Sequence, residues 1–308
     1  MAQNAPTNTS EFAAFLSPDQ AAPYFEQARR NSVVQSLARQ VPLGINGAEV
    51  PITTSKATAG WVSEGGRKPS TSAGLGVKSI KPHKIAAISV VSAEVVRANP
   101  GNYMEILRGD ITEAIAKAFD DAVLHGTNTP FDQHLGQATK TVDLGTATAA
   151  DGGVYSDLVD SLRELKNDGK RLTGFAFDDV TEPTFLSSVD ANGRPLFLES
   201  TYSGSVLSAG QLIGRSAYLG EGIANDSGSV VGFAGDWSQV IWGAVGGISF
   251  DVSTQTSVTL DGTLTSLWEH NLVAIRAEAE FGVLINDPQA FVKFGEAEAG
   301  DDGGEGND

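Results

Sequence analysis

The chain contains no cysteine among its 308 residues. This absence excludes disulfides, thiolate catalysis and zinc or iron–sulfur sites built on cysteine. Histidine is scarce as well, and the four residues present have no ligand spacing. They are His83, His125, His134 and His270. We interpret them as satisfied surface side chains, and we predict neither a metal site nor a cofactor.

Net positive charge and long apolar runs are also missing. The formal net charge is -17, which argues against a nucleic-acid-binding protein because phosphate binding needs a basic face. No apolar run approaches the roughly 18 residues of a membrane span, so no membrane partner is expected. The N-terminus lacks the basic and apolar regions of a signal peptide, which favours synthesis in the cytoplasm.

Catalytic motifs are absent too. The sequence has no Gly-x-Ser-x-Gly elbow, no Gly-x-x-x-x-Gly-Lys-Ser/Thr loop and no His-Glu-x-x-His. Asp178 and Asp179 follow a predicted strand, where an α/β enzyme can place carboxylates. We favour a structural interpretation, in which the pair ends the strand and leads into a helix capped by Thr181. No catalytic residue is predicted, and we expect the protein not to be an enzyme.

A long helix over residues 102–125 is the clearest element present. Its apolar residues recur at spacings of three and four and form one stripe. The stripe consists of Met104, Leu107, Ile111, Ile115, Ala118 and Ala122. Asn102 and Glu105 resemble a capping box, and His125 with Gly126 is typical of a helix end. At 1.5 Å per residue the helix is roughly 36 Å long, so we predict a strut.

A long hairpin is predicted before this helix. Residues 48–62 and 71–91 are rich in Val, Ile, Thr and Ser, and turn formers at 64–69 separate them. Its large apolar residues lie near the tip. They are Trp61, Val62, Leu75, Val77 and Ile80. Because an isolated two-stranded ribbon is marginal in water, we expect something outside this chain to cover the hairpin.

The hairpin is basic although the chain is acidic. Between Ala48 and Lys84 there are six basic and two acidic residues, a balance of +4. We expect this charge to draw the hairpin to another copy, with Trp61 as the anchor. The expected assembly interface consists of Trp61, Glu64, Arg67, Lys68, Lys78, Arg29 and Arg30. The alternative is that exposed strands carry lysine only to discourage edge pairing.

The remaining predicted elements are shorter. Residues 11–40 have a helical pattern broken by prolines, which predicts an arm of short helices. A helix is predicted over Ser156–Asn167. Strands are predicted at Gly174–Phe177, Gln211–Ile213, Ser216–Leu219, Val230–Phe233, Gln239–Trp242 and Ile248–Val252. The alternating strand at 273–283 needs a partner, and the best candidate is 85–91, which leaves 150–265 as an inserted domain.

In this order of parts the whole chain resembles the major capsid protein of tailed bacteriophages, with the HK-ninety-seven-like fold. Several short stretches carry the resemblance, and their order is more specific than any one of them. Examples are Gly60-Trp61-Val62-Ser63-Glu64-Gly65, Leu124-His125-Gly126-Thr127 and Gly235-Asp236-Trp237-Ser238. The others are residues 24–34, 50–52, 90–94, 193–197 and 281–291.

The resemblance implies an α+β fold with named parts. They are an N-terminal arm (1–47), an extended E-loop hairpin (48–84), a P-domain with the spine helix and a sheet (85–150 and 266–295) and an A-domain (151–265). The acidic tail at 296–308 is expected to be disordered. The implied function is structural: self-assembly into hexamers and pentamers of an icosahedral virion capsid around the double-stranded DNA genome of a tailed phage, in the host cytoplasm.

The resemblance also implies partners. A portal and a decoration protein are candidates, and a separate scaffolding protein is expected because Met1 leads almost directly into the arm. Contact with packaged DNA should be weak and non-specific, at positions such as Arg29, Arg30 and Arg39. Some relatives form Lys–Asn isopeptide cross-links between subunits, for which Lys56, Lys68 and Lys78 are candidates by position only.

Three further functions remain open. An encapsulin-type nanocompartment shell resembles the same fold and would package a cargo enzyme. A phage tail or adhesion module would explain the glycine-rich region 191–265 but neither the long helix nor the basic hairpin. The third possible function is that of an enzyme.

Overall fold

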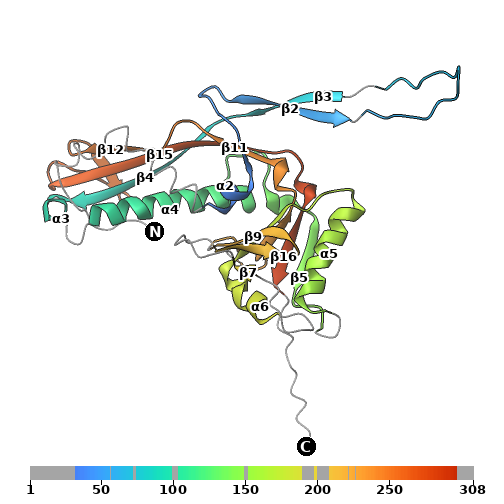
Figure 1. Ribbon diagram of the computed structural model, residues 1–308. Coiled ribbons are helices and arrows are strands. Elements are labelled where there is room, and N and C mark those ends of the chain that lie inside the picture. The colour runs from blue at the N-terminus through green and yellow to red at the C-terminus, as the bar shows by residue number, and fades with distance from the viewer. Residues whose placement is uncertain are drawn as a thin grey trace, which may run out of the picture.

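Two β-sheets and one long helix organise the chain (Figure 1). The computed structural model describes residues 32–55, 57–71, 74–98, 103–148, 152–188, 198–199, 208–220, 222–225 and 227–296. Residues 1–31 and 297–308 lie outside these ranges, so the expected arm helices before Ser32 and the expected disorder of the tail are not described. No helix in the described ranges is long and apolar enough to cross a membrane.

The long helix α4 (Tyr103–Leu124) confirms the predicted strut. Its buried stripe contains Ile111, Ile115 and Ala122 as expected. Ala118 was wrongly assigned, because it is exposed and the neighbouring Phe119 enters the core instead. The predicted end of the helix is confirmed: Gly126 has a φ of 77°, and its N–H donates to the carbonyl of Asp121 at 3.1 Å. Asn102 lies outside the described residues.

The first sheet lies against this helix and is centred on β15 (Leu272–Ile285). One edge of β15 pairs with β4 (His83–Ser92), so the predicted pairing of 273–283 with 85–91 is confirmed. Its other edge pairs with two strands in succession, and a fifth strand extends the sheet. These strands are β12 (Ser249–Ser253), β11 (Val240–Ala244) and β1 (Arg39–Gln40), the last parallel to β11.

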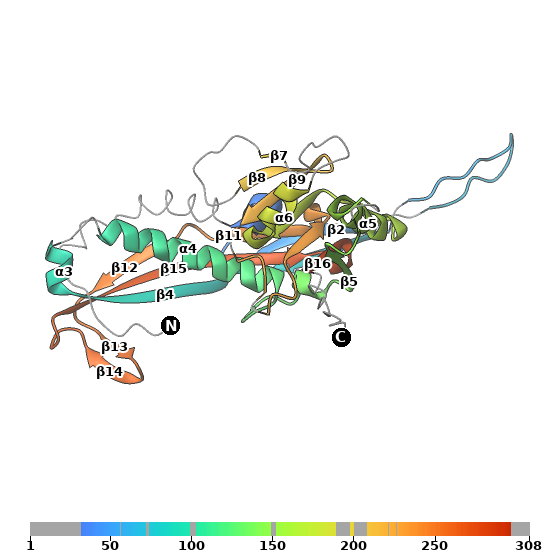
Figure 2. The ribbon, with the colours of Figure 1, turned by 90° about the horizontal axis from the view of Figure 1, so that it is seen from below.

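Burial along β15 departs from strict alternation near both ends. Residues 276–280 alternate between exposed or half-buried and buried side chains, as expected of a strand with one buried face. Leu272 to Ile275 are all buried, because a small hairpin covers the outer face there with Leu272 and Ala274 in its cluster. This hairpin is β13 (Ser257–Leu260) with β14 (Thr263–Ser266), and it projects from the end of the sheet (Figure 2).

The second sheet has seven strands. In spatial order they are β5 (Lys140–Leu144), β16 (Phe291–Glu296), β10 (Gly232–Gly235), β6 (Gly174–Asp178), β9 (Arg215–Gly220), β8 (Ser208–Leu212) and β7 (Leu198–Glu199). Helix α5 (Val154–Asn167) and helix α6 (Glu182–Ser187) cover one face, where Leu158 and Phe185 join the core. The other face meets α4, so every residue of β6 is buried.

Sheet membership does not follow the boundaries of 151 and 265 that we expected for the inserted domain. Strands β5 and β16 come from outside that range and complete the seven-stranded sheet. Strands β11 and β12 come from inside it and join the sheet of β15. The predicted strands themselves are found, with ends shifted by up to three residues. A strand pattern indicates which face is buried but not which edge the strand will join.

The two arms of the E-loop hairpin are shorter in the structure than the sequence predicted. Strands β2 (Ala48–Ser55) and β3 (Gly74–Ile80) pair antiparallel, and residues 57–71 form an irregular tip. The expected second arm of 71–91 is broken at Lys81-Pro82, because proline has no N–H to continue the ladder, and β4 starts after it. The two remaining α-helices of the described residues are α2 (Val33–Leu37) and α3 (Ala93–Ala98).

Candidate assembly surfaces

The hairpin of β2 and β3 is seated on the first sheet at its base. Ile80 is only 1% exposed and packs with Leu43 and Ile241. Two glycines of the sheet, Gly243 and Gly282, face each other in the β11–β15 pairing. A Cβ atom on Gly282 would lie 2.6 Å from Ile80 Cγ2, so the recess exists only because both positions lack a side chain.

Beyond this seat the two faces of the hairpin differ. On the inner face Val50 is half-buried, and Lys78 donates from Nζ to the main-chain oxygen of Asn286 at 2.9 Å. On the outer face Leu75 is 79% and Val77 is 63% exposed. Two large apolar side chains in water on an extended ribbon indicate a surface that a partner covers.

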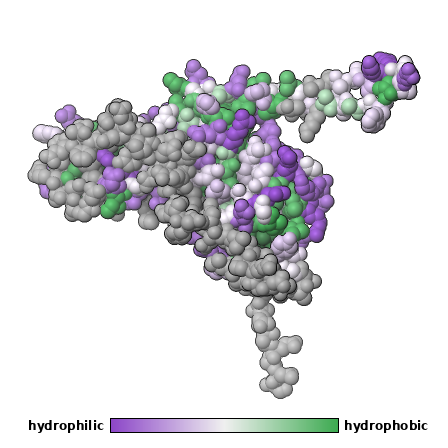
Figure 3. Space-filling model, viewed as in Figure 1, coloured by the Kyte–Doolittle hydropathy of each residue, from purple (hydrophilic) through white to green (hydrophobic). Residues whose placement is uncertain are grey.

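The tip carries most of the predicted interface residues. Trp61 is fully exposed, so it does not fold back onto its own hairpin. Figure 3 shows hydrophobic and hydrophilic residues side by side at this end of the molecule. The charged residues there are Glu64, Arg67 and Lys68, all exposed. A turn holds the tip in shape: Gly66 N–H donates to Ser63 O at 2.9 Å, and Gly65 has a φ of 74°.

Lys78, another predicted interface residue, is not brought to the tip. Lys78 lies in the shaft of the hairpin and bonds within its own chain. Arg29, Arg30 and Lys56 lie outside the described residues.

A second exposed apolar pair was missed from the sequence. Leu264 on β14 is 72% exposed and Trp268, just after β14, is 76% exposed. They lie at the end of the molecule opposite the tip of the E-loop hairpin (Figure 2). The only available signal was a tryptophan in the polar context of Ser266 and Glu269, which periodicity does not single out.

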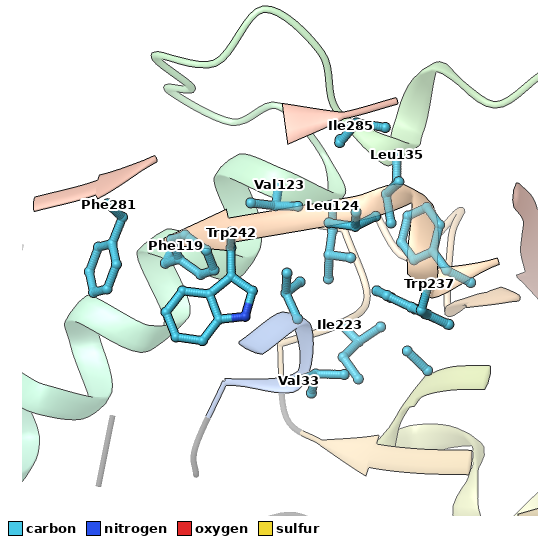
Figure 4. Packing of buried hydrophobic residues seen from close by; sticks show 14 of the residues in the cluster. Val33, Phe119, Val123, Leu124, Leu135, Ile223, Trp237, Trp242, Phe281 and Ile285 are labelled. Atoms are coloured by element: carbon cyan, nitrogen blue, oxygen red, sulfur yellow. The ribbon is translucent and has the colours of Figure 1, made fainter. Parts of the chain in front are cut away.

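The C-terminal end of α4 is a junction between the two sheets. In the main core its Phe119 and Val123 meet Val33 of α2 and Trp242 of β11 (Figure 4). His125 Nε2 lies 2.9 Å from the main-chain oxygen of Ile223, which comes from the loop after β9.

His134 closes the end of the helix. Its ring fits between Gly126 and Gly136, beside the carbonyl of Leu124, and burial lowers its pKa. His125 and His134 are thus half-buried side chains packed between elements, and not the surface side chains that we expected.

A buried carboxylate at this junction was also missed. Asp120 accepts hydrogen bonds from Ser32 Oγ at 2.7 Å and from the N–H groups of Val33 and Val34 at 2.9 and 3.3 Å. Burial raises the pKa of Asp120 to about 7, against the opposing effect of these three donors. An Asp on a helix pattern normally indicates the solvent face, so periodicity alone gave no reason to select it.

The acidic pair Asp178 and Asp179 follows β6, and Asp178 forms hydrogen bonds within the fold. Asp178 is buried and accepts from the N–H groups of Ile223 at 2.9 Å, Ala224 at 2.8 Å and Val180 at 3.3 Å. Thr181 was expected to cap α6 but instead donates from Oγ1 to the carbonyl of Asp178 at 2.7 Å. Within the described ranges, no group of three or more His, Asp or Glu side chains could hold a metal ion.

Comparison with known proteins gives a family for the chain. The model of the phage capsid family matches residues 13–295. A relative named probable major capsid protein gp17, from Mycobacterium phage D29, is 43% identical over 99% of this chain and 96% of its own length. Its counterpart from Mycobacterium phage L5 is 44% identical over 96% of this chain and 93% of its own. These relatives favour a phage capsid over a nanocompartment shell, a tail or adhesion module and an enzyme.

Solved structures support the same fold. A chain from Mycobacterium phage Bobi aligns with a TM-score of 0.68 at 20% identity, covering 95% of this chain and 99% of its own. A chain from Gordonia phage Cozz aligns with a TM-score of 0.67 at 22% identity, covering 87% of both chains. The expected HK-ninety-seven-like α+β fold is confirmed. The chain therefore belongs to the phage capsid family, as a major capsid protein.

Proposed function

We propose that the chain assembles into hexamers and pentamers of an icosahedral shell around the double-stranded DNA of a tailed phage. The observation that carries this proposal is the E-loop hairpin, which leaves the body of the subunit with Trp61, Leu75 and Val77 exposed. A two-stranded ribbon of this kind has little stability alone, and burial against a neighbour would supply it. The large family match supports the same conclusion.

The parts of the subunit take the following proposed roles. Residues up to 47 are the N-terminal arm, and 48–84 are the E-loop. The P-domain is built on α4 and the sheet of β15, and the A-domain is built on the seven-stranded sheet, with its limits set by sheet membership. Assembly in the host cytoplasm, with a separate scaffolding protein, a portal and a decoration protein as partners, is part of the proposal. A purely structural role without enzymatic activity is proposed too.

Trp61 is the proposed anchor of the E-loop on a neighbouring copy. Large aromatic residues that become fully buried dominate the energetics of many interfaces, and Trp61 has its whole surface available. Glu64, Arg67 and Lys68 follow it closely in sequence and would set the orientation of the E-loop tip through charge pairs at the rim of the interface. Arg29 and Arg30 would contribute from the arm.

Two measurements test assembly. Negative-stain microscopy of the purified chain should reveal ring-shaped capsomers or closed shells. Hydrogen exchange should find the tip residues 57–71 unprotected in free subunits and protected in the assembled form, because a partner covers the hairpin there. Residues 227–229 lie in the loop before β10, where Ser229 lies against Gly295 of β16, and they serve as the internal control. Equal protection of the hairpin in both states, or a monomer at every concentration, would overturn the proposal.

A further inference from the structure

The first described helix is fastened to the spine helix by one carboxylate. Ser32 and Asp120 lie 88 positions apart, and both are buried. The hydroxyl of Ser32 donates to Asp120 Oδ1 and accepts from Gln35 N–H at 3.1 Å, which makes Ser32 the N-cap of α2. Asp120 also accepts hydrogen bonds from the N–H groups of Val33 and Val34. The carboxylate thus bonds three consecutive residues at the root of the N-terminal arm.

Helix α2 depends on this attachment for its position. It has five residues, far too few to be stable as an isolated helix. Val33 and Val34 bury their side chains in the cluster of Ile115, Phe119 and Val123, Leu37 packs against the same cluster, and the Asp120 carboxylate holds the first turn of α2. Helix α2 is the first described element of the N-terminal arm, so its docking fixes the position of Ser32 at the start of the described chain.

The surroundings of Asp120 are poor in charge. Helix α2 has the sequence Val33-Val34-Gln35-Ser36-Leu37 and contributes no titratable group. On α4 the nearest charge is Asp121, which opposes ionisation of Asp120. The rest of the core around α2 is apolar, with Trp242 and Phe281 among its members. In the described part of the chain, an ionised Asp120 is thus stabilised only by neutral donors.

We propose that docking of α2 on the spine helix is coupled to the uptake of one proton by Asp120, so that the root of the N-terminal arm is held firmly in acidic conditions and loosens as the pH rises toward neutral. When α2 is docked, the buried carboxyl has a pKa of about 7. When α2 is released, Asp120 faces water and titrates near the ordinary aspartate value of about 3.9. The docked state binds the proton more tightly, so docking is strongest at low pH, weakens as the pH rises from about 4 to about 7, and levels off above that.

The size of the effect follows from the two titrations. Between pH 6 and pH 8 the docking equilibrium should fall about tenfold, because the docked carboxyl loses its proton over this interval while the released one is already ionised. This coupling between Asp120 and the docking of α2, which we call the latch, is a property of the single subunit. Its consequence for a shell, a change in where the arm meets its neighbours, rests on the proposed function.

Amide hydrogen exchange on free subunits tests the latch. The N–H groups of Ser36 and Ala38 donate within α2, to Ser32 O and Val34 O. Their protection factors, which correct for intrinsic exchange, should fall about tenfold from pH 6 to pH 8. Asp120→Asn keeps an acceptor but cannot ionise, so its protection should be the same at both pH values. Asp121→Asn is the matched control and should retain the fall with a lower midpoint, because it removes the charge that opposes ionisation of Asp120.

Further variants and readouts make the test decisive. If Asp120→Asn does not fold, Ser32→Ala removes one donor and keeps the titration, so the fall should persist with a higher midpoint. The carboxyl carbon shift of Asp120 should titrate near pH 7 in the wild type. Equal wild-type protection at pH 6 and 8, or a fall that survives in Asp120→Asn, would overturn the latch. Shell formation seen by microscopy is independent of these outcomes.

Discussion

Gly243 and Gly282 face each other across the β11–β15 ladder, and the side chains of Leu43 and Ile80 fill the space where two Cβ atoms would lie. The E-loop is therefore fixed to the sheet by a recess that only glycine can provide. A rigid base with an exposed tip is what a subunit needs in order to reach a neighbour at a set distance.

Gly282→Ala should destabilise the free subunit by about 1–3 kcal/mol, since the new Cβ would lie 2.6 Å from Ile80 Cγ2 and 2.8 Å from Lys81 O. Urea unfolding followed by fluorescence measures the change in the free energy of unfolding. Gly109→Ala on α4 is the control: its Cβ would meet nothing within 4 Å, and alanine favours a helix, so stability should rise slightly. An unchanged Gly282→Ala variant would contradict the recess.

Phe119→Ala should cost about 3–5 kcal/mol of stability. Phe119 is buried and lies with ring centroids 5.0 Å from Phe281 and 6.3 Å from Trp242, so its removal leaves a cavity between α4 and the first sheet. Glu113→Ala, on the exposed face of the same helix, should change stability by less than about 0.5 kcal/mol. A loss below about 1 kcal/mol for Phe119→Ala would mean that the core collapses to fill the space.

The sequence predicted the long helix well because its apolar spacing and its glycine end are local signals. Phe119 was missed because the stripe was traced through Ala118, one position away, where a small residue fits either face. Strand pairing was harder to predict than the helix. The pairing of β15 with β4 followed from matching patterns, but the membership of β11 and β12 in the same sheet did not. Neither the glycine recess nor the burial of Asp120 has a local signal, since both arise from contacts between distant segments.

Trp61→Ala should leave the stability of the free subunit unchanged and reduce assembly. Its side chain is fully exposed, so truncation removes no contact within the described chain. At an interface the same truncation would cost about 2 kcal/mol or more per contact. Circular dichroism melts and sedimentation on one preparation separate the two effects. Trp61→Phe, which keeps an aromatic surface, should assemble better than Trp61→Ala. A lower melting temperature of free Trp61→Ala subunits would show that the tryptophan serves its own hairpin instead.

Raised salt should weaken assembly more than it changes DNA retention. The hairpin between Ala48 and Lys84 has a balance of +4 on a chain of net charge -17, so contacts between copies include an attraction that counterions screen. Strong DNA binding requires many cation–phosphate contacts, which a chain of this charge does not favour. Light scattering across a salt series measures assembly, and Arg67→Glu should lower its salt dependence. Free subunits that bound duplex DNA at submicromolar concentration near 0.15 M salt would contradict the charge argument, and the arm with Arg29 and Arg30 would become the candidate DNA-binding element.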